Sequence, residues 1–309
     1  MRRKIIKLGQ ATYVASLPSK WIREHNLEKG DYLECEDVEG NLIFSTQKIS
    51  LHMEVTINLS NSGERTIRNI LNQTYRKGFD QIKLKFTQLQ QLDIIREIVR
   101  ETLLGFEIVR EETDFCVVEN IAEPSAEKFD IILRRLFLSI KQEGEELLEE
   151  LQQQKVPNLE RQNSNKNIVD NYTNFIRRLI IKNKIKGARD SYLLYYGISL
   201  LSLIHHGYFY LRKSISEHQR KALSMEFLSL LKETNALFET YYQAFYRNDL
   251  DLADHVQISK QHLMSKIYKS LLQKKGIENV ALCHLAEIIR MIQMSSTTFF
   301  GLYSQETKT

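Results

Sequence analysis

Residues 2–35 read RRKIIKLGQATYVASLPSKWIREHNLEKGDYLEC, and this stretch determines the fold that we expect for the N-terminal part of the chain. Gly9 and Gln10 break the first apolar run into two short strand candidates. Pro18 presets the backbone for the start of a helix that should run to about Asn26. The expected strands are Arg3–Leu8, Ala11–Ser16, Tyr32–Cys35 and Leu42–Ser45. The pattern therefore predicts four short strands around one short helix.

Charge is divided unevenly along the same stretch. The first 23 residues hold no acidic side chain and six basic ones: Arg2, Arg3, Lys4, Lys7, Lys20 and Arg23. Residues 24–60 hold eight acidic side chains and two lysines. A basic side on a small unit attracts phosphate groups and favours DNA, although a basic terminus that is merely solvated is the plainer alternative. A unit of about 48 residues also has little core and exposed strand edges, so we expect it to oligomerise.

The order of these features resembles that of the AbrB/MazE/SpoVT family. A basic opening strand, a Leu-Gly break, a second strand, a Leu-Pro-x-x-Trp helix entry and a Leu-x-x-Gly-Asp turn follow one another over about residues 2–48. The resemblance implies a homodimeric swapped-hairpin β-barrel that binds DNA. The family's DNA-facing basic positions match Arg3, Lys4, Lys7, Lys20 and Arg23, with Arg2 beside them.

Gln10 departs from the family pattern, because many members carry a basic residue just after the glycine of the strand break. A glutamine can still bond a base edge or a phosphate, so Gln10 stays among the expected DNA contacts, while the base preference is open. Antitoxin members share this fold, so the barrel by itself does not decide the role.

Residues 51–122 alternate between strand and helix patterns. Period-two alternation marks strands over 53–59 and 82–86, and helical spacing marks 67–75 and 92–103. Phe106–Val109 and Phe115–Val118 then close with a hairpin. The order β-α-β-α-β-β predicts a small α/β sandwich with its helices on one face.

The rest of the chain has helical periodicity. Six long helices are expected, at roughly 125–155, 160–187, 190–215, 217–247, 250–274 and 277–304. Short loops favour antiparallel neighbours, and two packed three-helix bundles are the simplest division. The expected protein is thus multidomain and mainly α-helical, with domains at 1–48, 51–122 and 125–309.

The helix count and the domain order look like those of the archaeal phosphate uptake regulators with PhoU-like domains. Two stretches carry the resemblance: NIVDNYTNFIRRLIIK (167–182) and TYYQAFYRNDLDLADHV (240–256). It implies a role in phosphate homeostasis, with components of a phosphate transporter or a histidine kinase as partners.

PhoU domains commonly hold metal clusters through Glu/Asp-x-x-x-Asp motifs, and this chain mostly lacks them. Lys166 stands four residues before Asp170, and Ser202 and His206 occupy positions where the resemblance expects acids. We therefore expect no cofactor and no metal site, with Asp170 and His206 as the remaining candidate ligands should an ion bind.

Other classes of function have little support in the sequence. It contains no GxGxxG, GxxxxGK[ST], GxSxG or HExxH motif, so we do not expect an enzyme. The three cysteines are scattered without a CxxC, which argues against a disulfide framework or a zinc site and suits a reducing cytoplasm. His255 and His262 lie seven residues apart, and packing or surface roles suit them best.

One apolar run requires a decision about membranes. Residues 191–211 carry no Asp, Glu, Lys or Arg, which suits either a spanning helix or the central helix of a soluble bundle. The serines, glycines, histidines and tyrosines in the run favour the buried helix, so no membrane insertion is expected.

We therefore expect a cytoplasmic, homodimeric, DNA-binding transcriptional regulator of phosphate uptake. One alternative is a protein that dimerises through its barrel without binding DNA and inhibits a phosphate transporter or its sensor kinase. A second is an antitoxin-like partner, against which the long helical bundle argues.

Overall fold

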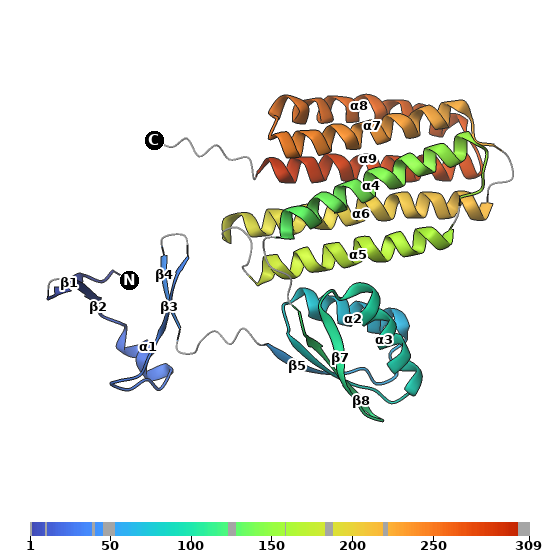
Figure 1. Cartoon of the computed structure of the whole chain (residues 1–309). Coiled ribbons are helices and arrows are strands. Elements are labelled where there is room, and N and C mark those ends of the chain that lie inside the picture. The colour runs from blue at the N-terminus through green and yellow to red at the C-terminus, as the bar shows by residue number, and fades with distance from the viewer. Residues whose placement is uncertain are drawn as a thin grey trace. The chain divides into compact units, whose positions relative to one another are not determined.

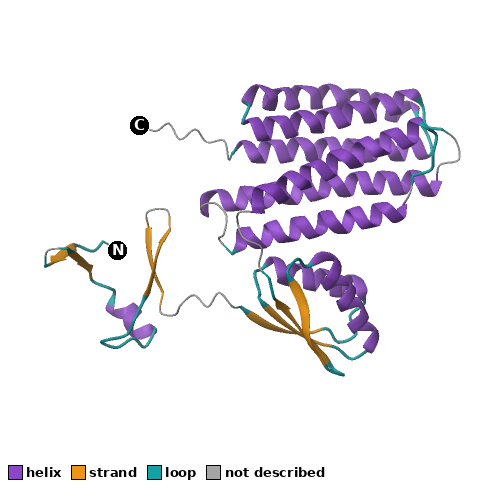
Figure 2. Cartoon of the chain, in the orientation of Figure 1, coloured by secondary structure: helices purple, strands orange, loops and turns teal. Residues whose placement is uncertain are grey.

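The computed structural model describes residues 2–9, 11–38, 41–45, 53–122, 128–157, 159–182, 188–218 and 222–301. The chain divides into two compact units, Met1–Met53 and Glu54–Thr309. Helices account for most of the second unit, whereas the first combines four short strands with one short helix (Figure 2). The expected multidomain, mainly helical fold is confirmed, and the structure adds that its α/β part holds a small mixed sheet, whereas the three expected domain limits stay predictions.

The N-terminal unit contains two antiparallel hairpins and one short helix. Its elements are β1 (Ile5–Leu8), β2 (Thr12–Ala15), α1 (Ser19–Glu24), β3 (Glu34–Val38) and β4 (Asn41–Ser45). Pro18 has a φ of −64° and directly precedes α1, as its fixed ring suggests. α1 stops at Glu24 rather than near Asn26, because Asn26 takes a left-handed conformation with a φ of 51°.

Each hairpin of this unit forms a separate two-stranded sheet, β1 with β2 and β3 with β4. The described residues of one chain thus contain no closed barrel. The turn that joins β1 to β2 includes Gly9, whose φ of 74° suits glycine, and Gln10, which lies outside the described residues. Residues 39 and 40, in the expected turn between β3 and β4, also lie outside them.

The second unit begins with an α/β part whose element order matches the expected β-α-β-α-β-β. The elements are β5 (Glu54–Asn58), α2 (Glu64–Arg76), β6 (Gln81–Lys85), α3 (Leu89–Thr102), β7 (Phe106–Glu111) and β8 (Phe115–Asn120). The sheet order is β5-β6-β8-β7, with β5 and β6 parallel and the other pairs antiparallel. Ile82 and Leu84 of β6 are buried while Lys83 and Lys85 are not, so the alternation in the sequence marks one covered face.

Six helices make up the rest of the described part of this unit. They are α4 (Phe129–Gln152), α5 (Leu159–Ile181), α6 (Ala188–His218), α7 (Met225–Arg247), α8 (Leu250–Gln273) and α9 (Ile277–Phe300). All six contribute to one hydrophobic core, and α6 makes its most extensive contact with α9. The division into two three-helix bundles, α4–α6 and α7–α9, stays a prediction, because the contact between α6 and α9 joins a helix of one expected bundle to a helix of the other.

Close packing of α6 on α9 depends on two glycines of α6. A Cβ atom built on Gly197 would lie 2.6 Å from the Phe299 ring, and one on Gly207 would lie 2.6 Å from Ile288 Cγ1. Both helices therefore approach more closely than larger residues would permit. The apolar run at 191–211 lies within α6, and no helix in the described part is both long and apolar enough to cross a membrane.

α5 lies where the helical bundle meets the α/β part. It contacts α4 and α6 on the bundle side and α2 and α3 on the other (Figure 1). Its polar residues therefore face two different neighbours, and this arrangement determines the ion pairs described below.

Candidate functional site

The basic residues of the N-terminal unit are exposed. Arg2, Arg3 and Lys4 precede β1, Lys7 lies in β1, and Lys20 and Arg23 lie in α1. Lys20 Nζ lies 3.7 Å from Glu24 Oε1, but both side chains are largely solvated, so this pair neutralises little of the basic charge. Gln10, the seventh expected DNA contact, lies outside the described residues.

The register of the first hairpin separates an apolar face from a mixed one. The aligned pairs are Ile5–Ala15, Ile6–Val14, Lys7–Tyr13 and Leu8–Thr12. Neighbouring side chains on a strand point to opposite faces, so Ile6, Leu8 and Val14 share one face, the apolar hairpin face. Lys7 shares the other face with Tyr13. The apolar hairpin face is uncovered in a single chain, with exposed fractions of 56%, 62% and 38%.

No described side chain between residues 2 and 45 is buried. An isolated two-stranded hairpin is marginally stable at best in water, because it buries too little apolar surface to offset its ordering entropy. The described part of the N-terminal unit therefore forms no buried core within one chain, and its apolar hairpin face is exposed.

Asp170 and His206, the two candidate metal ligands, do meet in the structure. His206 Nε2 lies 2.9 Å from Asp170 Oδ1, and Lys166 Nζ donates to Asp170 Oδ2 at 2.6 Å. Burial raises the pKa of the Asp170 carboxyl, but His206 and Lys166 together lower it more, and it ends well below its usual value. Lys166 thus occupies one oxygen of the carboxylate with a positive charge, and the described residues contain no group of three metal-ligating side chains.

His205 lies in a different environment from its neighbour. Its side chain is buried, and within the described ranges neither ring nitrogen has a hydrogen-bond partner. Burial, with the charge of His206, lowers the pKa of His205 to about 3, so its imidazole is neutral at physiological pH. It contributes to the core rather than to an ion site.

The bundle interior holds a second buried ion pair. Arg212 Nε of α6 donates to Glu143 Oε1 of α4 at 2.9 Å, and Arg212 also contacts Glu150. Burial raises the pKa of Glu143, an effect that Arg212 opposes. Both Glu143 and Arg212 are fully buried, so this pair links α4 to α6.

Polar side chains of α5 also bind the α/β part. Arg178 donates to Asp80 Oδ1 at 2.5 Å and to the backbone oxygen of Phe79 at 2.7 Å. Lys182 Nζ reaches the same Asp80 oxygen at 2.5 Å. One further residue, Asn174, accepts from Arg76 Nε at 2.7 Å. α5 is thereby attached to the end of α2 and the loop that follows it.

Sequence reasoning did not single out Arg76 or Arg177, although both lie at this boundary. Arg177 is 6% exposed, and its Nε atom has no hydrogen-bond partner among the described residues. A signal was available in the stretch FIRRLII (175–181), since two arginines inside an apolar helical run must be buried with partners or beside a neighbour that compensates their charge.

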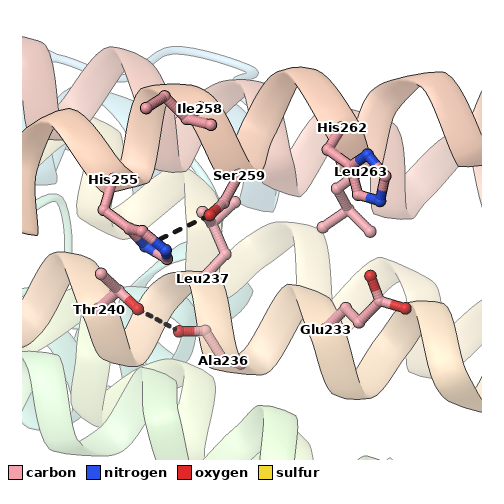
Figure 3. Close-up of a pocket in the computed structure, with 9 residues that line it drawn as sticks. All are labelled: Glu233, Ala236, Leu237, Thr240, His255, Ile258, Ser259, His262 and Leu263. Atoms are coloured by element: carbon pink, nitrogen blue, oxygen red, sulfur yellow. Dashed lines mark hydrogen bonds between the residues drawn. The ribbon is translucent and has the colours of Figure 1, made fainter.

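A shallow groove of about 360 Å³ separates α7 from α8 (Figure 3). Its two histidines, His255 and His262, are exposed and lie two turns apart on α8. His255 Nδ1 is 3.3 Å from Ser259 Oγ, and Thr240 Oγ1 donates to the Ala236 backbone oxygen at 3.0 Å. Each contact joins two residues of the same helix, the first within α8 and the second within α7. The polar groups therefore do not converge on a common point, whereas a binding site requires such convergence.

The chain was compared with protein-family models, curated proteins and solved structures, and none of them matches it.

Proposed function

We propose that the chain is a homodimeric DNA-binding regulator of transcription, in which the N-terminal units of two copies associate and present their basic residues to the DNA backbone. The observation that carries this proposal is that residues 2–45 contain no buried described side chain, while the six basic side chains of residues 2–23 are all exposed. A unit with this composition gains a core by pairing, and its exposed basic residues match a polyanion.

Self-association explains the apolar hairpin face. Ile6, Leu8 and Val14 would pack against a second copy, and two interleaved copies would cover the exposed edges of the two hairpins. Lys7, on the opposite face of β1, would stay accessible in such a dimer. A two-fold dimer also matches two half-sites in DNA. The swapped-hairpin barrel, suggested by the resemblance, is one arrangement with these properties.

The second unit would supply regulation. Its long helices, joined to the α/β part through α5, form the larger part of the chain and lie in a compact unit separate from the hairpins. The resemblance of its helical pattern to PhoU-like regulators makes phosphate uptake the proposed process, with the cytoplasm as its location. We do not propose a metal ion for Asp170 and His206, because Lys166 already neutralises that carboxylate.

A gel-shift experiment on genomic fragments at increasing salt tests the proposal. The intact chain should bind at low salt, and the logarithm of its affinity should fall linearly with the logarithm of the salt concentration. Lys7→Ala and Arg23→Ala should weaken binding similarly on all fragments, each reducing the salt slope by about 0.9 for one lost phosphate contact.

Lys29→Ala is the matched control, since Lys29 is exposed in the turn region after α1 among acidic neighbours. It should bind like the unaltered chain. An absence of binding at low salt would reject the regulator. Genome-wide occupancy that does not change between phosphate-rich and phosphate-starved cells would reject the link to phosphate.

A further inference from the structure

Two arginines from distant parts of the sequence lie near each other at the boundary between α2, α5 and α6, and no carboxylate among the described residues pairs with either. Arg76 is the last residue of α2, and Arg177 lies near the end of α5. The only hydrogen-bond acceptor that the described residues offer Arg76 is Asn174 Oδ1, at 2.7 Å. The Arg177 guanidinium lies over the ring of Tyr195 of α6, 5.7 Å from its centroid.

Two carboxylates at this boundary, Asp80 and Asp170, already have cationic partners. Asp80 is shared by Arg178 and Lys182. Asp170 receives Lys166 and His206. Compensation for the arginine pair is therefore incomplete on the described part of the chain.

The electrostatic state of Arg177 reflects this imbalance. Burial and the positive charge of Arg76 lower the pKa of Arg177 to about 10, although Tyr195 and the charge of Asp170 oppose part of the effect. Burial likewise lowers the pKa of Arg76, although the charge of Asp170 offsets part of the effect. An arginine that is buried without an acceptor is costly, because its guanidinium loses hydration and gains nothing in exchange. An anion seated between the two would repay that cost.

We propose that Arg76 and Arg177 form a binding site for a phosphate-type oxyanion, either the free ion or the phosphate group of a small monoester. Guanidinium groups suit such ligands because their planar forks bond two oxygens at once. Arg76 and Tyr195 are only partly buried, whereas Arg177 is buried. This site lies in the second unit and does not depend on whether the N-terminal unit binds DNA.

Calorimetric titration of the full chain with inorganic phosphate, in a chloride buffer at physiological ionic strength, tests the site. We expect one phosphate bound per chain and at least tenfold weaker binding to Arg76→Gln and to Arg177→Gln. Arg65→Gln is the matched control, because Arg65 lies exposed on the same helix as Arg76. Its affinity should equal that of the unaltered chain. A parallel titration with adenosine monophosphate identifies the source: tighter binding than inorganic phosphate assigns the site to a monoester, and weaker binding assigns it to the free ion.

Two further measurements separate loss of the ligand from loss of the fold. Thermal unfolding should show that phosphate raises the melting temperature of the unaltered chain and of Arg65→Gln, but not that of the two site variants. Arg177→Lys retains the charge without the fork, so it should fold and still bind phosphate more weakly than the unaltered chain. Equal phosphate affinity in all these proteins, or no saturable binding to the unaltered chain, would overturn the proposal.

Discussion

Arg178 of α5 and Asp80, in the loop between α2 and β6, form a buried ion pair with 2.5 Å between Nη2 and Oδ1, and their side chains are 2% and 5% exposed. Lys182 reaches the same carboxylate oxygen from the end of α5, at 2.5 Å. One aspartate therefore compensates two cations where the helical bundle meets the α/β part. Burying several charged groups is tolerable only when all of them are paired.

Asp80→Asn should destabilise the second unit strongly, because it removes the buried carboxylate that Arg178 and Lys182 share. We expect the free energy of unfolding to fall by about 3 kcal/mol or more, measured by urea denaturation. Asp93→Asn removes a carboxylate from an exposed pair with Arg96 and is the control, for which no resolvable change is expected. Equal effects of the two substitutions would show that burial of the Asp80 group is not what matters.

Gly207→Ala should destabilise the contact between α6 and α9. The added Cβ would lie 2.6 Å from Cγ1 of the fully buried Ile288, so the helices would have to separate. Overpacking of this kind costs about 1–3 kcal/mol and opposes the gain of up to about 1 kcal/mol in helix propensity. The melting temperature should fall more for Gly207→Ala than for Gly63→Ala, where nothing lies within 4 Å of the new atom and only the loss of a glycine at the N-cap of α2 counts. A Gly207→Ala protein as stable as the parent would contradict the close approach.

Removing the Asp170 carboxylate should cost stability in a way that depends on pH. Asp170→Asn loses two charge-assisted contacts, to His206 and Lys166, and should lower the free energy of unfolding by about 2 kcal/mol at neutral pH. Because the pKa of Asp170 is lowered in the folded state, its contribution is complete above the usual pKa of an aspartate and disappears as the pH falls below it.

The difference between the parent and Asp170→Asn should therefore shrink on acidification from roughly pH 5 to pH 2. Urea denaturation at several pH values measures it. A difference that stays constant over this range would mean that the carboxylate carries no stabilising charge.

Charges placed on the apolar hairpin face should prevent self-association. Ile6→Asp combined with Val14→Asp puts two like charges on directly paired positions of β1 and β2, where the proposed dimer would bury them. Light scattering should then give the mass of one chain instead of two. Tyr13→Asp changes the opposite face of the same hairpin and should leave the dimer intact. A parent chain that is already monomeric at micromolar concentration would contradict the proposed homodimer.

The sequence alone determined the order and type of most elements, because periodicity follows from which face of each element is buried. The break between α7 and α8 is an example: the expected helices end at 247 and resume at 250, and the structure has Arg247 and Leu250, with Asp249 capping α8 through its side chain. The start of α7 was placed eight residues early, at 217 instead of Met225. α6 continues to His218, and the side chain of Ser224 caps the start of α7. The residues between them are mostly polar, so the spacing of apolar residues does not mark where one helix ends and the next begins.

Tertiary structure decided which polar groups meet. Asp170 and His206 were singled out together as candidate ligands, but only the packing of α5 on α6 shows that they pair with each other and that Lys166 completes the contact. Nothing in the sequence places Arg76 beside Arg177, which lies on another helix about a hundred residues later. Local periodicity tells which side of a helix is covered, whereas the partner of a buried charge depends on which helix covers it, and that follows from the packing of the whole unit.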